Sequence, residues 1–224
     1  MKTYVFDLDG TIAEVGKKAP TEVLDKIKKL DGRIVVCSGK PVYYLCGFLR
    51  QAGLYDAVII GENGAVLQFG VNLPPLRIEQ KYSIKAKENL KRIKDAIDKI
   101  YPDMWYQPNE ICLTPFPTDD SQFIEIEKLL KVNPDYLEDV DKYVHFDSID
   151  FSPKGVSKAS SLKLLANYLN EDILDFRAIG DGNNDYSMFD VVGLSIGINL
   201  EDTEKADLNF YSIFEALDYL LENK

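Results

Sequence analysis

The amino-acid sequence predicts an α/β fold built on a largely parallel sheet, and three observations support this. Short apolar segments alternate with amphipathic helical patterns early in the chain, in the order expected for parallel strands joined by crossover helices. This alternation stops near residue 80 and resumes after residue 153. Polar side chains follow several of the apolar segments, and ligands bind at the carboxyl ends of the strands in such sheets.

The first part of the chain shows this alternation most clearly. Val23 and Ile27 recur at helical spacing, and Gly53 closes a second helical pattern. Asn63-Gly64 predicts a tight turn, after which the chain returns as a hairpin arm. The expected elements are a strand at residues 4–6, a helix at 20–30, a strand at 33–37, a helix at 42–52, a strand at 56–60 and the arm at 65–69.

The middle of the chain is expected to form an inserted α+β domain. The stiff segment Leu73-Pro74-Pro75-Leu76 is unsuited to a central strand. It precedes a lysine-rich helix at residues 81–100, a strand at 105–116, a helix at 119–132 and a strand at 143–151. The parallel pattern resumes with a helix at 157–169, a strand at 176–179, a short helix at 186–189, strands at 194–198 and 206–210 and a helix at 213–221. The prediction is a Rossmann-like core domain, residues 1–80 and 153–224, interrupted by a domain at residues 81–152.

The composition is that of a globular protein with an acidic surface. Of 224 residues, 46% are hydrophobic and 28% are charged, and the formal net charge is −11. Such a surface repels nucleic acids and anionic membranes, so neither is expected as a partner. The apolar runs are too short to span a bilayer, and no basic segment followed by an apolar one opens the chain. We expect a cytoplasmic monomer or homodimer with reduced thiols at Cys37, Cys46 and Cys112.

Two aspartates, Asp7 and Asp9, follow the first strand. Residues two apart in an extended strand lie on one side, so both carboxylates are expected to face one site, and Gly10 permits a sharp turn there. Burying two close carboxylates unpaired is costly. A hard cation such as Mg²⁺, which prefers oxygen ligands, would compensate them. The alternative is an ordinary turn, in which Asp and Gly are common.

A second acidic cluster, Asp181-Gly182-Asn183-Asn184-Asp185, follows a later strand. Asp and Asn are natural helix N-caps, which is the structural alternative. Three capping residues within one turn exceed what a cap requires, so a metal site opposite Asp7 explains the acidic residues better.

Ser38 and a pair of lysines are the remaining candidates. Ser38 lies between a strand and a helix, where its hydroxyl and the free amides can hold a phosphate oxygen, although Ser is also a common cap. Lys40 can add positive charge there, although a solvated lysine is the favoured interpretation. Lys154 and Lys158 lie at the start of a helix, where lysine opposes the helix dipole unless an anion pairs with it. One of the two is therefore expected at the acidic site.

These residues together resemble the haloacid dehalogenase-like (HAD) phosphatase superfamily. The four matching motifs occur in the family's order: Asp7-Leu8-Asp9-Gly10-Thr11, Val36-Cys37-Ser38-Gly39-Lys40, Lys158, and Ile179-Gly180-Asp181-Gly182-Asn183-Asn184-Asp185. The insertion between the second and third motifs is similar to the larger α+β (C2B) cap of one branch, as is Glu62-Asn63-Gly64-Ala65 ahead of it. Lys40 and Ala159 depart from the family, where Arg and Gly are frequent.

The resemblance implies a phosphoric monoester hydrolase with an aspartyl-phosphate intermediate. Asp7 would be the nucleophile and Asp9 the general acid and base. Mg²⁺ would be held by Asp7, the backbone carbonyl of Asp9 and Asp181, with Asp185 binding directly or through water. Phosphate and substrate contacts would come from Ser38, Gly39, Lys158 and Asn184. Lys158 would be essential and would also keep Asp7 ionised, whereas Lys154 would be exposed.

The substrate is expected to be a small phosphorylated metabolite in a pocket enclosed by the cap. Length and cap size are most similar to archaeal phosphoglycolate phosphatases. Sucrose-phosphate, mannosyl-phosphoglycerate and hexose-phosphate phosphatases are close alternatives. A less favoured alternative is a phosphomutase, which uses the same core and returns the phosphate to the product instead of releasing it. A binding protein is disfavoured because Asp7, Asp9, Asp181 and Asp185 are all present, and a stable phosphoacceptor is disfavoured because Asp9 supplies the base for hydrolysis. His145 is expected on a partly exposed strand, where it can line the substrate pocket.

Overall fold

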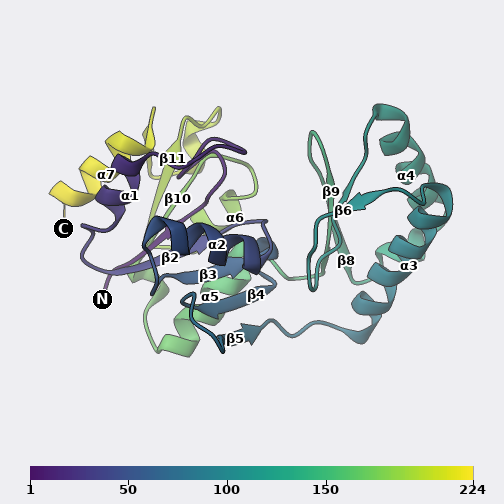
Figure 1. Ribbon diagram of the computed structural model, residues 1–224, viewed down its shortest axis with the longest axis horizontal. Coiled ribbons are helices and arrows are strands. Elements are labelled where there is room, and N and C mark those ends of the chain that lie inside the picture. Colours follow the sequence, from purple (N-terminus) through teal and green to yellow (C-terminus); the bar gives the residue numbers. More distant parts are fainter. Residues whose placement is uncertain (224) are drawn as a thin grey trace. The chain divides into compact units, whose positions relative to one another are not determined.

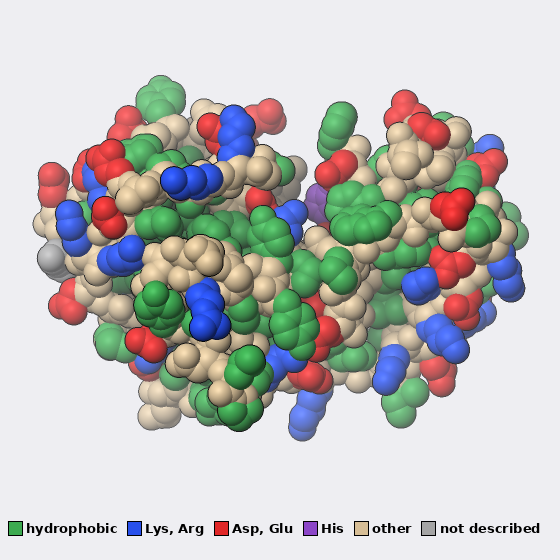
Figure 2. Space-filling model, viewed as in Figure 1, with side chains coloured by type: hydrophobic (Ala, Val, Ile, Leu, Met, Phe, Trp, Pro, Cys, Tyr) green, Lys and Arg blue, Asp and Glu red, His purple; other side chains and the backbone are tan. Residues whose placement is uncertain are grey.

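The computed structural model describes residues 1–223, and the chain divides into two compact units. Unit 1 comprises Met1–Glu79 and Ser157–Lys224, and unit 2 comprises Gln80–Val156. Acidic and basic side chains are interspersed over the face that Figure 2 displays. Within residues 1–223, no helix is both long enough and apolar enough to cross a membrane.

Unit 1 is built on one eight-stranded sheet in the order β12-β11-β10-β1-β2-β3-β4-β5 (Figure 1). Its strands are β1 (Thr3–Phe6), β2 (Arg33–Cys37), β3 (Val58–Gly61), β4 (Val66–Phe69), β5 (Leu76–Glu79), β10 (Phe176–Gly180), β11 (Leu194–Ile198) and β12 (Leu208–Phe210). Neighbours from β12 to β3 are parallel, whereas β4 and β5 pair antiparallel. The predicted α/β fold with a mainly parallel core sheet is confirmed.

Helices cover both faces of this sheet, which is why its central strand β1 is buried along its whole length (Figure 1). They are α1 (Thr21–Ile27), α2 (Val42–Ala52), α5 (Lys158–Leu169), α6 (Tyr186–Phe189) and α7 (Ile213–Glu222). On one face, Leu162 and Leu165 of α5 join Val5, Val35 and Val58 in one buried cluster. In the opposite layer α1 packs against α7, while α2 contacts β3. This packing fixes the strands whose ends carry the polar residues.

Unit 2 combines two helices with two small antiparallel sheets. The helices are α3 (Ile84–Ile100) and α4 (Asp120–Val132), and the strands are β6 (Trp105–Tyr106), β7 (Pro115–Phe116), β8 (Val140–Val144) and β9 (Ile149–Pro153). Ile93 and Ile97 of α3 and Ile126 of α4 pack with Phe151 of β9 in a separate apolar core. Each helix begins at a capping side chain, with Ser83 accepting a hydrogen bond from Ala86 N and Asp119 accepting one from Gln122 N.

The strand predictions were wrong in three places. Residues 105–116 are not one strand: β6 and β7 flank a loop that begins at Gln107-Pro108-Asn109, and proline lacks the N–H that a strand ladder requires. Residues 143–151 contain a turn between β8 and β9, closed by the His145 N–H donating to Ser148 O. β5 was missed because it begins directly after Pro75, and it forms the edge of the sheet.

Candidate active site

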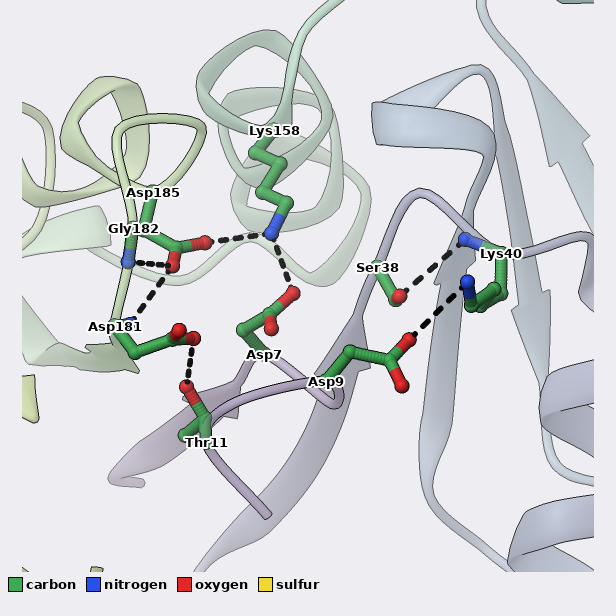
Figure 3. A network of polar contacts seen from close by, with 9 residues as sticks. All are labelled: Asp7, Asp9, Thr11, Ser38, Lys40, Lys158, Asp181, Gly182 and Asp185. Carbon is green, nitrogen blue, oxygen red and sulfur yellow. Dashed lines mark hydrogen bonds and ion pairs between the residues drawn. The ribbon is translucent and has the colours of Figure 1, made fainter. Parts of the chain in front are cut away.

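Three neighbouring strands bring the predicted polar residues to one edge of the sheet. In register, Phe6 of β1 pairs with Ile179 of β10 and with Val36 of β2. Asp7 directly follows β1, while Ser38 and Asp181 directly follow β2 and β10. In Figure 3 the Asp7 side chain lies between those of Asp181 and Ser38. The convergence follows from the parallel order of the strands, because their carboxyl ends share one edge.

Lys158 joins two carboxylates in the interior of unit 1. Its Nζ lies 2.6 Å from Oδ1 of Asp7 and 2.6 Å from Oδ1 of Asp185 (Figure 3). The Lys158 side chain is 1% exposed, against 5% for Asp7 and 0% for Asp185. Lys158 is the first residue of α5, whose start is set by a capping box between Ser157 and Ser160. A lysine at a helix start opposes the helix dipole, and here two anions compensate it.

The second carboxylate oxygen of Asp185 organises the loop after β10. Its Oδ2 accepts hydrogen bonds from the backbone N–H groups of Asp181, at 3.0 Å, and Gly182, at 3.1 Å. A Cβ on Gly180 would lie 2.4 Å from the Asp185 carboxyl carbon, so only glycine allows this approach. The buried Asp185 therefore links the loop to Lys158.

The Asp181 carboxylate is held by a residue in the segment that follows β1. Thr11 Oγ1 donates a hydrogen bond to Asp181 Oδ1 at 2.9 Å, and Thr11 is buried. Gly10 has a φ of +90°, and a Cβ there would lie 2.0 Å from Asp181 Oδ2. The segment Gly10-Thr11 thus both admits and orients Asp181. Thr11 was not predicted as a site residue. The sequence indicates such a role only through the position of Thr11 two residues after Asp9.

The carboxylates of Asp7, Asp181 and Asp185 form a site that fits a divalent cation. One oxygen from each lies within 4.8 Å of the others. These oxygens are the ligand type that Mg²⁺ prefers. Three carboxylates and the single ammonium of Lys158 leave a formal charge of −2, which one divalent ion balances. Asp9 is not a member of this carboxylate group within residues 1–223.

The pKa shifts at the site reflect this excess negative charge. Burial, Lys158, Asp185 and Asp181 together bring the pKa of Asp7 to about 7: burial is the largest cause and raises it, Lys158 lowers it, and Asp185 and Asp181 raise it. Burial also raises the pKa of Asp181, with Thr11 lowering it. Burial alone would lower the pKa of Lys158, but Asp185 and Asp7 outweigh it and raise that pKa. Lys158 is therefore held in its charged form, and it lowers the pKa of Asp7 against burial and the two neighbouring carboxylates.

Asp9 forms an ion pair with Lys40 and lies outside the group formed by the other three carboxylates. Lys40 Nζ lies 3.5 Å from Asp9 Oδ2, and the Lys40 side chain remains partly exposed to solvent (Figure 3). β1 ends at Phe6, so Asp9 lies in the turn that follows the strand, where it forms an isolated β-bridge with Ala13. The backbone N–H of Lys40 donates to Ser38 Oγ at 3.3 Å.

The remaining candidates lie farther from this network. Lys154 and Asn184 are exposed, whereas Gly39 is half-buried beside Asn63. His145 lies in the β8–β9 turn of unit 2, with its Nε2 3.1 Å from Asp150 Oδ2.

Cys37, at the end of β2, is also part of the interior of unit 1. Burial raises the pKa of its thiol to about 12, which makes it a poor nucleophile.

A cavity of about 540 Å³ adjoins the Asp181 side of the site in unit 1. Its lining combines carboxylates, amides and one tyrosine and comprises Gly10, Asp181, Gly182, Asn183, Tyr186, Ile198, Asn199, Glu201 and Asp202. The acidic lining disfavours a phosphate group, and Ser38 and Lys158 do not border it. The cavity therefore does not include these two residues, which the sequence predicts to contact phosphate.

Comparison with known proteins identifies related sequences and folds. A family model described as haloacid dehalogenase-like hydrolase matches residues 4–139 and 76–200. A phosphoglycolate phosphatase of Methanococcoides burtonii is 25% identical over 233 residues, covering 100% of this chain and 98% of the relative.

Two solved structures share the fold. A haloacid dehalogenase-like hydrolase from Bacteroides thetaiotaomicron has a TM-score of 0.81 at 17% identity, covering 100% of this chain and 99% of the other. A sugar phosphatase of HAD subclass IIB has a TM-score of 0.71 at 18% identity, with the same coverage. At these identities the likeness establishes the architecture, including the inserted second unit, and not the substrate.

Proposed function

The chain belongs to the haloacid dehalogenase-like hydrolases and is a phosphatase of that family, and from this premise we propose that it hydrolyses a small phosphomonoester by way of a phosphoryl group carried on Asp7. The observation that carries the proposal is the buried Lys158, with its Nζ 2.6 Å from both Asp7 and Asp185. Burying a cation and two carboxylates carries a desolvation cost that apolar side chains would not. Their presence together at a strand end therefore indicates a role in the chemistry of the site. Lys158 orients the nucleophile and adds positive charge where a phosphate must approach.

Two steps follow from the roles proposed for Asp7 and Asp9. In the first, an Asp7 oxygen forms a bond to phosphorus while the bond from phosphorus to the substrate oxygen breaks, and Asp9 gives its proton to that oxygen. In the second, Asp9 takes a proton from water, the water oxygen bonds to phosphorus, and the bond to Asp7 breaks. Inorganic phosphate leaves, and Asp7 and Asp9 return to their starting states.

Asp7, Asp181 and Asp185, with the Asp9 carbonyl, would hold Mg²⁺. The ion would neutralise charge on the transferring phosphate and allow an anionic nucleophile to approach it. Ser38 and Lys158 would bind phosphate oxygens, supported by the position of Ser38 at the end of β2 and of Lys158 at the start of α5. We assign Gly39 and Asn184 to the same role on the resemblance of the motifs alone.

Phosphoglycolate is the substrate that we propose. A relative named phosphoglycolate phosphatase aligns over the whole chain at 25% identity. The alternative is a sugar phosphate, favoured by the shared architecture with a sugar phosphatase of subclass IIB. We propose that unit 2 is the cap whose side chains choose between such substrates.

The test is phosphate release from a panel of phosphoglycolate, hexose phosphates, sucrose phosphate and p-nitrophenyl phosphate, with Mg²⁺ and with EDTA. We expect release that requires Mg²⁺ and is fastest on phosphoglycolate. A sugar phosphate as the best substrate would replace the proposed specificity with the alternative. Absence of release from every compound would overturn the phosphatase proposal and favour a phosphomutase. In the same assay Asp7→Asn should release no phosphate. Asp95→Asn is its matched control, because Asp95 is exposed and lies outside the carboxylate cluster.

A further inference from the structure

Lys40 is the partner of Asp9. Its Nζ lies 3.5 Å from Asp9 Oδ2, with side-chain exposures of 32% for Lys40 and 19% for Asp9. Among residues 1–223, no other side chain forms a hydrogen bond or an ion pair with the Asp9 carboxylate. Lys40 is therefore the side chain placed to orient this carboxylate.

The backbone of Lys40 is fixed on both sides, unlike that of an ordinary surface lysine. Its N–H donates to Ser38 Oγ at 3.3 Å, and its carbonyl accepts from the Glu62 N–H at 3.0 Å. The Asn63 N–H donates to Ser38 O at 3.1 Å, so two hydrogen bonds tie the β2–α2 turn to the turn after β3.

The turn after β3 has an uncommon backbone conformation. Glu62 and Asn63 have φ angles of 55° and 53°, in the left-handed region. Such conformations persist where surrounding contacts hold them, often at functional sites. The proline at position 41 adds a fixed φ immediately after Lys40. The lysine side chain thus extends toward Asp9 from a rigid base.

We infer that Lys40 is a positioning residue that holds the Asp9 carboxyl group for proton transfer to the leaving oxygen of the substrate. This inference rests on the proposed function, in which Asp9 is the general acid. Proton transfer requires a donor within hydrogen-bond reach of its acceptor, and small misplacements reduce rates strongly. In the two proposed steps, Asp9 is the residue that gives up and takes back a proton, and Lys40 acts through Asp9.

A competing role for Lys40 is direct contact with the phosphate group, and the leaving group separates the two. An alkyl phosphate such as phosphoglycolate expels an alkoxide, which needs a proton from Asp9. p-Nitrophenyl phosphate expels a stabilised phenolate, which needs none. A phosphate contact serves both substrates equally, whereas positioning of the acid serves the alkyl phosphate alone.

The experiment compares kcat/KM for the best alkyl phosphate and for p-nitrophenyl phosphate in Lys40→Met, Lys40→Arg and the unaltered protein. We expect Lys40→Met to reduce kcat/KM for the alkyl phosphate by about 10- to 100-fold, which is part of what a general acid contributes. The same change should reduce kcat/KM for p-nitrophenyl phosphate by less than about threefold. Lys40→Arg keeps the cation and is expected to restore most of the alkyl phosphate activity. Lys28→Met is the matched control, because Lys28 forms a similar pair with Asp25 at 3.7 Å on α1.

Equal losses on both substrates would contradict the inference and assign Lys40 to phosphate binding, as would a change in KM alone. Unchanged activity on both would also overturn it. Lys40→Gln serves as a second variant if Lys40→Met does not fold. Failure of the proposed function has a different signature, because the unaltered protein would then release no phosphate or Asp7→Asn would remain active.

Discussion

The two sides of Asp7 differ in burial, charge and contacts. On one side, Lys158, Asp185 and Asp181 are closely joined, with two 2.6 Å contacts to one buried ammonium. On the other side, Asp9 and Lys40 form a looser 3.5 Å pair that solvent reaches. The buried side is suited to hold a metal and a nucleophile in fixed positions. The open side is suited to meet substrates and exchange protons with water.

This difference also predicts how each side responds to substitution. Removing one partner of a buried pair leaves an uncompensated charge in the interior, which costs far more than losing an exposed pair. Changes on the buried side should therefore affect activity, metal binding and stability together. Changes on the open side should affect catalysis with little effect on folding.

Asp7→Asn tests the buried side most severely. An amide cannot act as the nucleophile, so we expect kcat to fall more than about 10³-fold, as when other covalent nucleophiles are removed. The fold should persist, because the change removes one negative charge from a cluster with excess negative charge. Phosphate release and circular dichroism measure the two effects. Near-normal activity would show that Asp7 is not the nucleophile.

Lys158→Met compared with Lys154→Met tests burial directly, since both lysines lie in one short segment. Lys158→Met leaves Asp7 and Asp185 unpaired and should lower the free energy of unfolding by about 3–5 kcal/mol and abolish turnover. The exposed Lys154 should change stability by less than about 0.5 kcal/mol. Urea denaturation with EDTA present measures both variants. Equal losses of unfolding free energy in the two variants would contradict the conclusion that burial makes the Lys158 contacts strong.

Thr11→Val tests how strongly the supporting hydrogen bond to Asp181 matters. The change keeps the shape of the side chain but removes the 2.9 Å bond that orients the carboxylate. Loss of such a supporting partner weakens metal affinity by about 10-fold or more. The Mg²⁺ concentration for half-maximal activity should rise accordingly, while Thr11→Ser, which keeps the hydroxyl, should stay close to the unaltered protein. An unchanged Mg²⁺ requirement in Thr11→Val would exclude Asp181 as an important ligand.

The His145–Asp150 pair in unit 2 provides a partly exposed reference outside the carboxylate site. Its hydrogen bond to Asp150 raises the pKa of His145, with burial opposing and Asp147 adding to the shift. The stabilisation is therefore fully present below the unfolded pKa of about 6.5 and is lost as pH rises through the higher folded value. His145→Asn should lower the free energy of unfolding by no more than about 1 kcal/mol below pH 6.5 and by nothing at high pH. A loss that persists at high pH would contradict the charged pair.

The sequence predicted unit 1 far better than unit 2. Central strands such as β1 and β10 are short, apolar and bounded by turn residues, so pattern and topology agree. The strands of unit 2 pair only two to five residues in small antiparallel sheets. At that length a turn such as the one at His145 interrupts alternation without an obvious signal, because no Gly or Pro marks it.

The same contrast holds within the candidate site. Asp7, Ser38 and Asp181 were placed together because strand ends converge. The contacts of Thr11 and Lys40 depend on side-chain reach across loops, which spacing along the chain does not encode. The position of Asp9 likewise depends on the turn after β1, because β1 ends one residue before Asp7.

Capture of the phosphorylated enzyme tests the central claim most directly. Asp9→Asn removes the base for the second step, so p-nitrophenyl phosphate, which needs no acid to leave, should load the enzyme with phosphate. Acid quenching, digestion and mass spectrometry would locate the added phosphoryl group. The account predicts one phosphoryl group on the peptide that contains Asp7 and none in Asp7→Asn. Phosphate release by the unaltered enzyme together with a phosphoryl group on another residue, or on none, would contradict it.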